Sequence, residues 1–403
     1  MAKGYKIKRY SNIYRRHPRR RFTRAIRVIL VVAVLFAVGW AVYQPVYDLL
    51  FPAGGESSSQ PAELSSSLPE ESSAPAAEEP EEPVVLPQSA GGQMVYLPPE
   101  TLADTASLPA LLESLQAGGM QEILIDLKDA EGLVLYQSQV EAAASSLDPQ
   151  YDLAQVTAAA QAAGVRVAGR LWAFQDRMAA TVLYDSCVKY NDTTFNWLDN
   201  DAEDGGKPWL NPYDSEAQQY LLDLMEEAMG LGVQDIVLAG VQFPSGISLS
   251  AANYGPEEEN TPRAQVLYDF VARARELAAQ QEGSCWYQVA ASDLLAPSTD
   301  PLSIYGGSVA TATGDHPVLV DVTPQNLTQE AVAVLALDAQ QQADPVQVIA
   351  AQLAALGQQG VTPYLDLDSL SGDGGTLLEQ LSQDQTWTAC DGYVLAGQEL
   401  LGE

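Results

Sequence analysis

Short apolar runs alternate with longer segments rich in Ala, Leu and Gln along the chain from residue 93 onward. The short runs are rich in Val, Ile and Leu, and Gly or Pro lies between them and the longer segments, which is typical of buried strands and helices. The pattern predicts strands at Met94–Leu97, Ile123–Leu127, Val165–Phe174, Asp235–Ala239, Trp286–Ala291, Val318–Val322, Pro363–Leu367 and Tyr393–Leu395. It predicts helices at Leu108–Gln116, Leu153–Ala163, Ser215–Met229, Arg263–Gln281 and Pro345–Leu356.

Strands separated mostly by helices indicate an α/β fold. Eight of them within residues 93–403 predict a (β/α)₈ barrel of the TIM type. A doubly wound open sheet is the alternative. It is disfavoured because no Gly-rich phosphate-binding turn follows any predicted strand, so we expect no nucleotide cofactor.

An uncharged apolar segment, Val28–Tyr47, precedes this region. As a helix it would be about 30 Å long, which matches the hydrocarbon core of a membrane. Arg24 and Arg27 lie at its start, and its aromatic residues gather toward its far end. This arrangement predicts a transmembrane signal anchor at 28–47, a cytoplasmic tail at 1–27 and an extracytoplasmic remainder. A cleaved signal peptide is the alternative, but the apolar and basic stretches are long for one.

Residues 48–92 are dominated by Ser, Glu, Pro and Ala. Such a segment cannot bury enough apolar surface to offset the entropy lost on ordering. We therefore predict a disordered acidic linker that holds the folded domain away from the membrane. The alternative is that the acidic run binds a basic partner.

Charge is distributed unevenly along the chain. Of the 20 Lys and Arg residues, 11 lie in residues 1–27, which contain no acid, whereas all 53 Asp and Glu residues lie beyond them. Nucleic acid is therefore not expected as a ligand. Cys187, Cys285 and Cys390 are too few and too far apart for a disulfide scaffold. With only His17 and His316, a multi-histidine metal site is excluded, and we expect no metal.

Polar residues at the predicted strand ends are the candidates for chemistry, because barrels bind ligands there. In the second strand Asp126 and Lys128 alternate with apolar residues, so both should point into the barrel. They could form an internal structural pair or face a ligand. If they formed a closed network with Arg170 and Asp176, a sugar site here would lose most of its support.

Acids and aromatic residues near the strand ends suit a sugar site. A glycosidase needs two carboxyl groups beside the scissile bond, and Asp293, Asp321 and Asp366, with Asp176, are the available acids. Trp172, Trp209 and Tyr213 are the aromatic candidates. We expect Trp172 to be core and Trp209, in a loop, to contact ligand.

Several short motifs resemble a bacterial family of glycoside-hydrolase domains, distantly similar to the α-amylase-like enzymes. The resemblance runs over most of Gln93–Gly397 and rests on the order and spacing of the motifs. They are Ile125–Asp129 with Gly132, Gly169–Asp176, Trp209–Tyr213, Gly232–Ile236, Phe243-Pro244 and Asp321–Pro324. The resemblance implies a (β/α)₈ barrel. The ligand-site positions that it carries over are Asp126, Lys128, Asp129, Arg170, Asp176, Trp209, Asn211, Pro212 and Tyr213.

The fourth-strand motif departs from this family. The family places an Asp and an Arg just before Phe-Pro, where this chain has Ala239 and Gln242, and an aromatic where it has Gly240. Thr323 likewise replaces a Tyr. Alanine cannot act as a nucleophile or stabilise a developing charge. Joint loss of the Asp and Arg fits an ion pair whose halves are costly to keep singly.

Three functions follow from these features. The first is a degenerate glycoside-hydrolase-like barrel that binds cell-envelope glycan, such as wall polysaccharide, without turnover. The second is an active glycosidase that uses Asp293, Asp321 or Asp366 as its catalytic acids. The third is a non-enzymatic envelope scaffold whose barrel binds a protein partner.

Overall fold

The computed structural model describes residues 92–357, 359–370, 374–383, 387, 390 and 392–401. The predicted tail and transmembrane segment lie outside these residues, and so does the predicted linker except for its last residue, Gly92, which begins the first strand. Within the described part of the chain, no helix combines the length and apolar character needed to cross a membrane.

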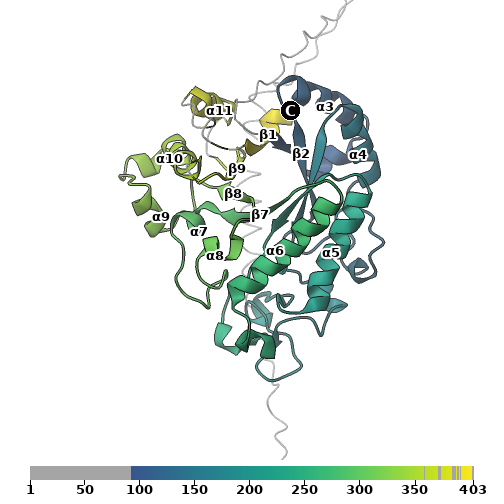
Figure 1. Ribbon diagram of the computed structural model, residues 1–403. Coiled ribbons are helices and arrows are strands. Elements are labelled where there is room, and N and C mark those ends of the chain that lie inside the picture. The colour runs from purple at the N-terminus through teal and green to yellow at the C-terminus, as the bar shows by residue number, and fades with distance from the viewer. Residues whose placement is uncertain are drawn as a thin grey trace, which may run out of the picture. The chain divides into compact units, whose positions relative to one another are not determined.

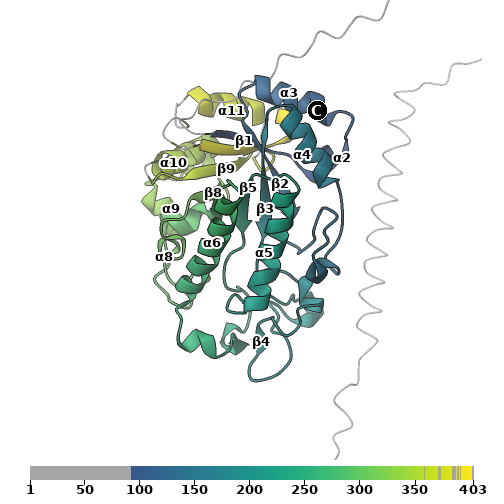
Figure 2. The same cartoon turned by 45° about the vertical axis from the view of Figure 1, so that its right-hand side comes forward.

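Eight parallel strands close into a barrel, as the sequence predicts (Figures 1 and 2). They are β1 (Gly92–Tyr96), β2 (Glu122–Lys128), β3 (Arg166–Trp172), β5 (Asp235–Ala239), β7 (Cys285–Ala290), β8 (Val318–Val322), β9 (Thr362–Asp366) and β10 (Gly392–Ala396). Neighbours around the barrel follow the order β1-β2-β3-β5-β7-β8-β9-β10, and β10 pairs with β1 to close it. Each predicted strand is confirmed to within two residues at either end.

The helices between the strands cover the outside of the barrel (Figure 1). The five predicted helices correspond to α3 (Leu108–Ala117), α4 (Leu153–Ala162), α5 (Ser215–Gly230), α6 (Arg263–Gln280) and α10 (Pro345–Gly357). The helices that the pattern did not predict are α2 (Pro99–Ala103), α7 (Ala291–Leu295), α8 (Val309–Thr313), α9 (Gln329–Val334) and α11 (Gly374–Gln383). Local chemistry sets helix starts. The Asp214 carboxylate accepts from the backbone N–H groups of Glu216 and Ala217, which caps α5.

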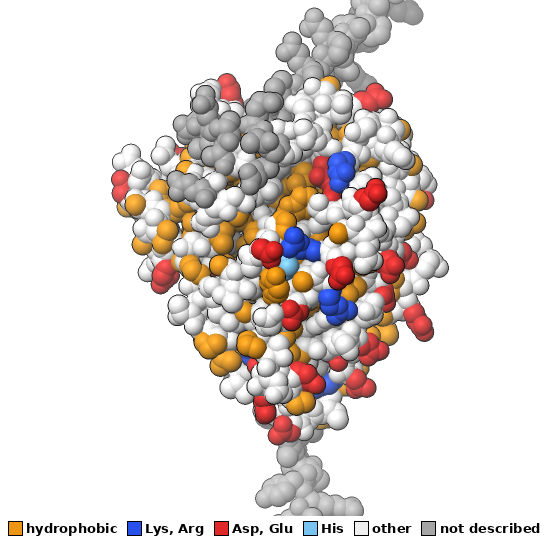
Figure 3. Space-filling view, in the orientation of Figure 1, with side chains coloured by type: hydrophobic (Ala, Val, Ile, Leu, Met, Phe, Trp, Pro, Cys, Tyr) orange, Lys and Arg blue, Asp and Glu red, His pale blue; other side chains and the backbone are white. Residues whose placement is uncertain are grey.

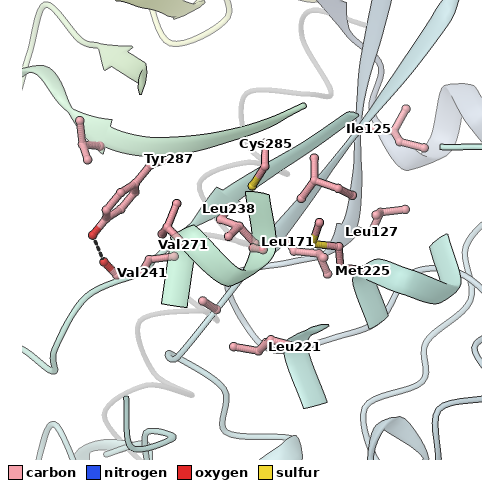
Figure 4. Packing of buried hydrophobic residues seen from close by; sticks show 14 of the residues in the cluster. Ile125, Leu127, Leu171, Leu221, Met225, Leu238, Val241, Val271, Cys285 and Tyr287 are labelled. Carbon is pink, nitrogen blue, oxygen red and sulfur yellow. Dashed lines mark hydrogen bonds between the residues drawn. The ribbon is translucent and has the colours of Figure 1, made fainter. Parts of the chain in front are cut away.

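Alternation along each strand divides the apolar side chains into two sets. One set points outward and packs against the helices, and Figure 4 shows part of this shell between the strands and α5 and α6 (Ile125, Leu127, Leu171, Leu221, Met225, Leu238, Val271). The Tyr287 hydroxyl, in the same view, donates to the carbonyl oxygen of Val241 and ties β7 to the end of β5. The other set points into the barrel (Met94, Leu124, Ala168, Val237, Leu319, Tyr364, Val394, Ala396).

Two long segments leave the barrel where β3 and β5 end. Residues 173–214 and 240–262 contain β4 (Lys189–Tyr190) and β6 (Ala252–Asn253), which pair antiparallel as a small sheet. In Figure 2, β4 lies beyond the lower ends of α5 and α6. We call these two segments the lobe. Because they follow the C-terminal ends of their strands, the lobe lies at the end of the barrel where ligands usually bind.

The described surface carries mainly negative charge. Acidic side chains are spread over the face seen in Figure 3, and basic ones are few. Of the nine basic residues that follow residue 27, seven lie within ion-pair distance of an acid (Lys128, Arg166, Arg170, Arg177, Lys207, Arg263, Arg275).

Candidate functional site

The C-terminal ends of the strands form the mouth of the barrel. Arg170 of β3 and Asp126 of β2 are register partners, so their side chains meet inside it. Arg170 Nε lies 2.6 Å and a terminal guanidinium nitrogen 2.9 Å from the two carboxylate oxygens of Asp126. The Tyr96 hydroxyl donates to Asp126 Oδ2 at 2.8 Å. The guanidinium also lies over the rings of Tyr96 and Tyr364, 5.0 and 5.4 Å from their centres.

Lys128 makes a second ion pair with Asp176, and both side chains are fully buried, with Nζ 2.9 Å from Oδ2. Lys128 Nζ also donates to the carbonyl oxygen of Trp172 at 2.5 Å. Oδ1 of Asp176 accepts from the backbone N–H groups of Met178 and Ala179. The pair therefore fastens the end of β2 to the segment after β3, and neither group can be reached from the mouth.

These contacts correct one expectation about the second strand. Asp126 and Lys128 do not pair with each other. Each is neutralised by a residue of the third strand or the segment after it. All four charged side chains are thus paired with one another within the protein, and this pairing argues against them as ligands for a sugar. A ligand at the mouth would have to bind other groups.

The end of β5 offers no acid. Ala239 is 1% exposed and is the register partner of Trp172. Gly240 has φ +61°, and a Cβ there would lie 3.1 Å from Trp172 Cε3, so the indole occupies the space that a side chain at position 240 would need. Trp172 is only partly buried, which differs from its predicted place in the core. Gln242, also partly buried, occupies the place of the expected Arg.

Three acids with raised pKa values remain near the mouth. Burial raises the pKa of Asp321 on β8, and the charge of Asp366 adds to the rise while Arg170 opposes it. Burial also raises the pKa of Asp366, which ends β9. Asp293, on α7, has its pKa raised by burial, and its carboxyl hydrogen-bonds the Tyr305 side chain. Asp321 and Asp366 come from adjacent strands, whereas Asp293 lies in the helix after β7.

The predicted loop contacts are structural. Trp209 is 2% exposed rather than open to ligand, and its indole N–H donates to Asp199 at 3.1 Å. Asn211 donates to the carbonyl oxygen of Tyr254, and the Tyr213 hydroxyl donates to that of Thr261. These contacts hold the lobe together. Pro212 is buried, and Asp129 accepts from the backbone N–H groups of Glu131 and Leu133, closing the turn after β2.

A pocket of about 140 Å³ opens beside the Arg170–Asp126 pair, at the ends of β1, β9 and β10. Its lining includes the rings of Tyr96 and Tyr364 and the polar side chains of Glu100, Asp366, Asp368 and Gln398. We call it the rim pocket. Of these residues, the sequence drew attention to Asp366 and Asp368, which lie at the end of the seventh predicted strand. Tyr96 and Tyr364 lie within predicted strands, and their alternation with outward-facing Val95 and Leu365 was the available signal.

The remaining reactive residues lie in the protein interior. His316 is 4% exposed, stacks on Tyr268 and contacts Arg275, and burial lowers its pKa. It precedes β8 and is therefore at the opposite end from the mouth. The side chains of Cys187, Cys285 and Cys390 are buried. Among the described residues, no three His, Cys, Asp or Glu side chains are grouped to hold a metal ion.

Residues 94–285 match a family described as "Putative glycosyl hydrolase domain". This confirms the resemblance expected from the motifs. The match runs from β1 to the start of β7, so it includes the altered fourth-strand motif. It stops short of the predicted limit at Gly397 and leaves out the strands that carry Asp321 and Asp366.

Several solved structures are similar to this chain, and none of the curated proteins matches it. A hypothetical protein from Ruminiclostridium thermocellum shares 21% identity over 48% of this chain and 96% of its own, with a TM-score of 0.42. An α-amylase from Lactobacillus plantarum shares 15% over 77% of this chain and 72% of its own, with a TM-score of 0.48. A family 20 exo-β-N-acetylglucosaminidase from Vibrio harveyi shares 12% over 77% of this chain and 50% of its own, with a TM-score of 0.46.

Proposed function

We propose that this chain is a membrane-anchored, extracytoplasmic glycoside-hydrolase-like protein that binds cell-envelope glycan without hydrolysing it. The observation that carries the proposal is the end of β5. Ala239 and Gln242 stand where the related family has an Asp and an Arg, and the Trp172 ring would crowd a side chain at position 240. The strand that would supply the central carboxylate supplies none.

The pairing of the other charges supports the absence of turnover. Hydrolysis of a glycosidic bond needs one carboxyl group to donate a proton and another to act as nucleophile or base. Asp126 has both oxygens bonded to Arg170, and Asp176 is buried against Lys128. Neither carboxylate is free to approach a sugar.

The rim pocket is the best-supported binding surface at the mouth. The closed pairing of the four predicted charges removes them as ligands, so the proposal rests on different residues. Carboxylates of Asp366 and Asp368 can accept hydrogen bonds from sugar hydroxyls, and the amide of Gln398 can donate to them. The rings of Tyr96 and Tyr364 add apolar surface beside these polar groups.

The sequence before the barrel supports the location. The uncharged segment 28–47, with basic residues before it and a polar linker after it, would place the barrel outside the membrane, next to wall polysaccharide. We therefore propose a single-pass cell-membrane protein whose ligand belongs to the envelope.

Cosedimentation of the full-length chain with purified bacterial cell walls tests binding. The double variant Glu100→Gln and Gln398→Ala removes one exposed charge and one exposed amide from the rim pocket and should weaken retention at least about tenfold. The matched control is Glu141→Gln, since Glu141 is exposed but lines a separate surface cavity. Equal retention of the double variant, or no retention of the unaltered chain, contradicts the proposal.

A second candidate is an active glycosidase that uses Asp321 and Asp366. The observation in its favour is that both acids lie on adjacent strands at the mouth and both have raised pKa values, as a general acid requires. Release of reducing ends from the same walls, lost in Asp321→Asn or Asp366→Asn, would establish it.

A third candidate is a scaffold that binds a protein. It is favoured by exposed apolar side chains on the lobe, namely Tyr190, Phe195, Ile247 and Leu249, of which Phe195 is 69% exposed. Two results together would favour this function over the first. The chain would bind a protein partner in the absence of cell walls, in a manner that depends on Phe195, and the chain would not be retained on walls.

A further inference from the structure

A cavity of about 350 Å³ lies at the end of the barrel opposite the mouth, where the strands begin. It is larger than the rim pocket and is lined by the first residues of β1, β2, β3, β7, β8, β9 and β10. Small-molecule sites in proteins have volumes of about 300–1,000 Å³, so this one is large enough for a single sugar ring.

Two glycines explain why this end of the barrel is hollow. Gly92 of β1 and Gly392 of β10 are register partners on adjacent strands. Each lies two residues before an inward-facing side chain, Met94 or Val394, so each points into the barrel. Barrel interiors are normally filled by layers of side chains from alternate strands. Here two neighbouring strands contribute none to the first layer.

The inward-facing apolar cluster separates this cavity from the mouth. Met94, at 3% exposure, forms part of the upper wall of the cavity, and Leu124, Val237, Leu319 and Val394 complete the same cluster with no exposed surface. A ligand in the cavity would therefore not reach Asp321 or Asp366. The two ends of the barrel can be altered independently.

Polar groups at one side of the cavity form an incomplete network. Asp235 accepts from Arg166 and from the backbone N–H of Ser284, so its hydrogen bonds are made within the protein. Glu122 is 8% exposed, and its Oε1 has no hydrogen-bond partner. Burial, followed by a hydrogen bond to Asp235, raises the pKa of Glu122 to about 9. Arg166 Nε lies 3.9 Å from Glu122 Oε1, and the same guanidinium pairs with Asp235.

Trp286 supplies an aromatic surface in the same cavity. It belongs to the inward-facing set of β7 yet is only partly buried, because the glycines opposite do not cover it. Thr362 of β9 adds a hydroxyl to the lining. An indole face with a carboxyl, a hydroxyl and a guanidinium nearby matches a ring that is apolar on its faces and carries hydroxyl groups at its edge.

We propose that the cavity at the N-terminal end of the barrel binds a neutral pyranose, whose ring packs on Trp286 and whose hydroxyl groups bond to Glu122 and Thr362. This site is separate from the rim pocket and does not depend on the function proposed for the mouth. A charged ligand is disfavoured because Arg166 is already paired with Asp235 and lies 3.9 Å from Glu122.

Calorimetric titration of the full-length chain with methyl β-glucoside, methyl β-galactoside and methyl α-mannoside tests the proposal. Gly92→Leu would fill the cavity without removing a contact residue. The position tolerates a side chain, since an added Cβ meets only Gln121 Oε1, at 3.4 Å. We expect at least one pyranoside to bind and Gly92→Leu to weaken it at least about tenfold.

Two further variants keep the test decisive. Gly230→Leu is the matched control, because a Cβ there meets nothing within 4 Å, and it should bind as the unaltered chain does. Trp286→Leu removes the ring but keeps an apolar side chain, and it should weaken binding about tenfold even if Gly92→Leu fails to fold.

The outcome also separates this site from the mouth. A pyranoside bound in the rim pocket instead would be weakened by Gln398→Ala and not by Trp286→Leu. The proposal is overturned if no pyranoside binds the folded chain at millimolar concentration, or if binding survives Trp286→Leu and is lost in Gln398→Ala. It is also overturned if deleting residues 79–91 is needed for binding, because the preceding chain would then be the occupant.

Discussion

Arg170 and Asp126 form a two-pronged ion pair across the mouth of the barrel, with Arg170 nitrogens 2.6 and 2.9 Å from the two carboxylate oxygens. The two residues are register partners on β3 and β2, so the pairing of the strands itself brings them together. The side chains are 9% and 11% exposed. The ion pair therefore occupies one side of the mouth in the absence of a ligand.

Removal of one partner of this ion pair should lower the free energy of unfolding. Asp126→Asn leaves the Arg170 charge buried without its carboxylate, and an uncompensated buried charge costs about 3–5 kcal/mol. We expect the free energy of unfolding, measured by urea denaturation of the full-length chain, to fall by that amount. The double variant Asp126→Leu and Arg170→Met should recover most of the loss. A loss below about 1 kcal/mol in the single variant, typical of a surface pair, would contradict the burial described here.

Gly132 is predicted to be irreplaceable because of Asp176. It has φ +87°, and an added Cβ would lie 2.3 Å from Asp176 Oδ1, in the Lys128–Asp176 pair. Gly132→Ala should therefore destabilise the folded protein, both through backbone strain and through disruption of the Lys128–Asp176 pair. Gly164→Ala is the matched control, with φ +72° and open space around the Cβ, so strain alone costs about 1–2 kcal/mol. Similar midpoints of urea unfolding for the two variants would show that the contact with Asp176 is unimportant.

Ionisation of Glu122 should lower the stability of the folded protein as the pH rises into the alkaline range. Its pKa is raised from 4.5 to about 9, so the folded protein holds this proton more tightly than the unfolded chain. The resulting stabilisation is complete below about pH 4.5 and is lost as the pH rises through about 9. Asp235 and Arg166 face the same group and are retained in the test.

The measurement is the melting temperature between pH 5 and pH 10. We expect Glu122→Gln, which is uncharged throughout, to lose less stability than the unaltered chain as the pH rises. The exposed Glu141→Gln variant should follow the unaltered chain. Parallel curves for Glu122→Gln and the unaltered chain would mean that Glu122 is ionised at neutral pH.

The sequence predicted the barrel well because its signal is repeated and local. Asp235–Ala239 and Val318–Val322 are short apolar runs bounded by Gly or Pro, and both are strands with those bounds. The short helices α7, α8 and α9 were missed, since five or six residues give no helical period to detect. Alternation also placed Asp126 inside the barrel correctly.

The site was less predictable because partners come from distant parts of the chain. A register shift between Asp126 and Lys128 breaks the alternation at Lys128, whose partner Asp176 lies 48 positions further on. Trp209 was expected in an open loop, yet it packs inside the lobe, whose antiparallel pairing involves strands of only two residues. Such short strands leave no alternating pattern. The cavity beside Trp286 depends on Gly92 and Gly392, which are adjacent only because the barrel closes.

The central claim is that the mouth binds glycan without cleaving it, and reducing-end release from purified bacterial cell walls and soluble glucans tests it most directly. The full-length chain, shown to be folded by circular dichroism and to be retained on the walls, should release no more reducing ends than a heat-denatured control. Release above that control, abolished by Asp293→Asn, Asp321→Asn or Asp366→Asn, would contradict the claim and identify a catalytic acid.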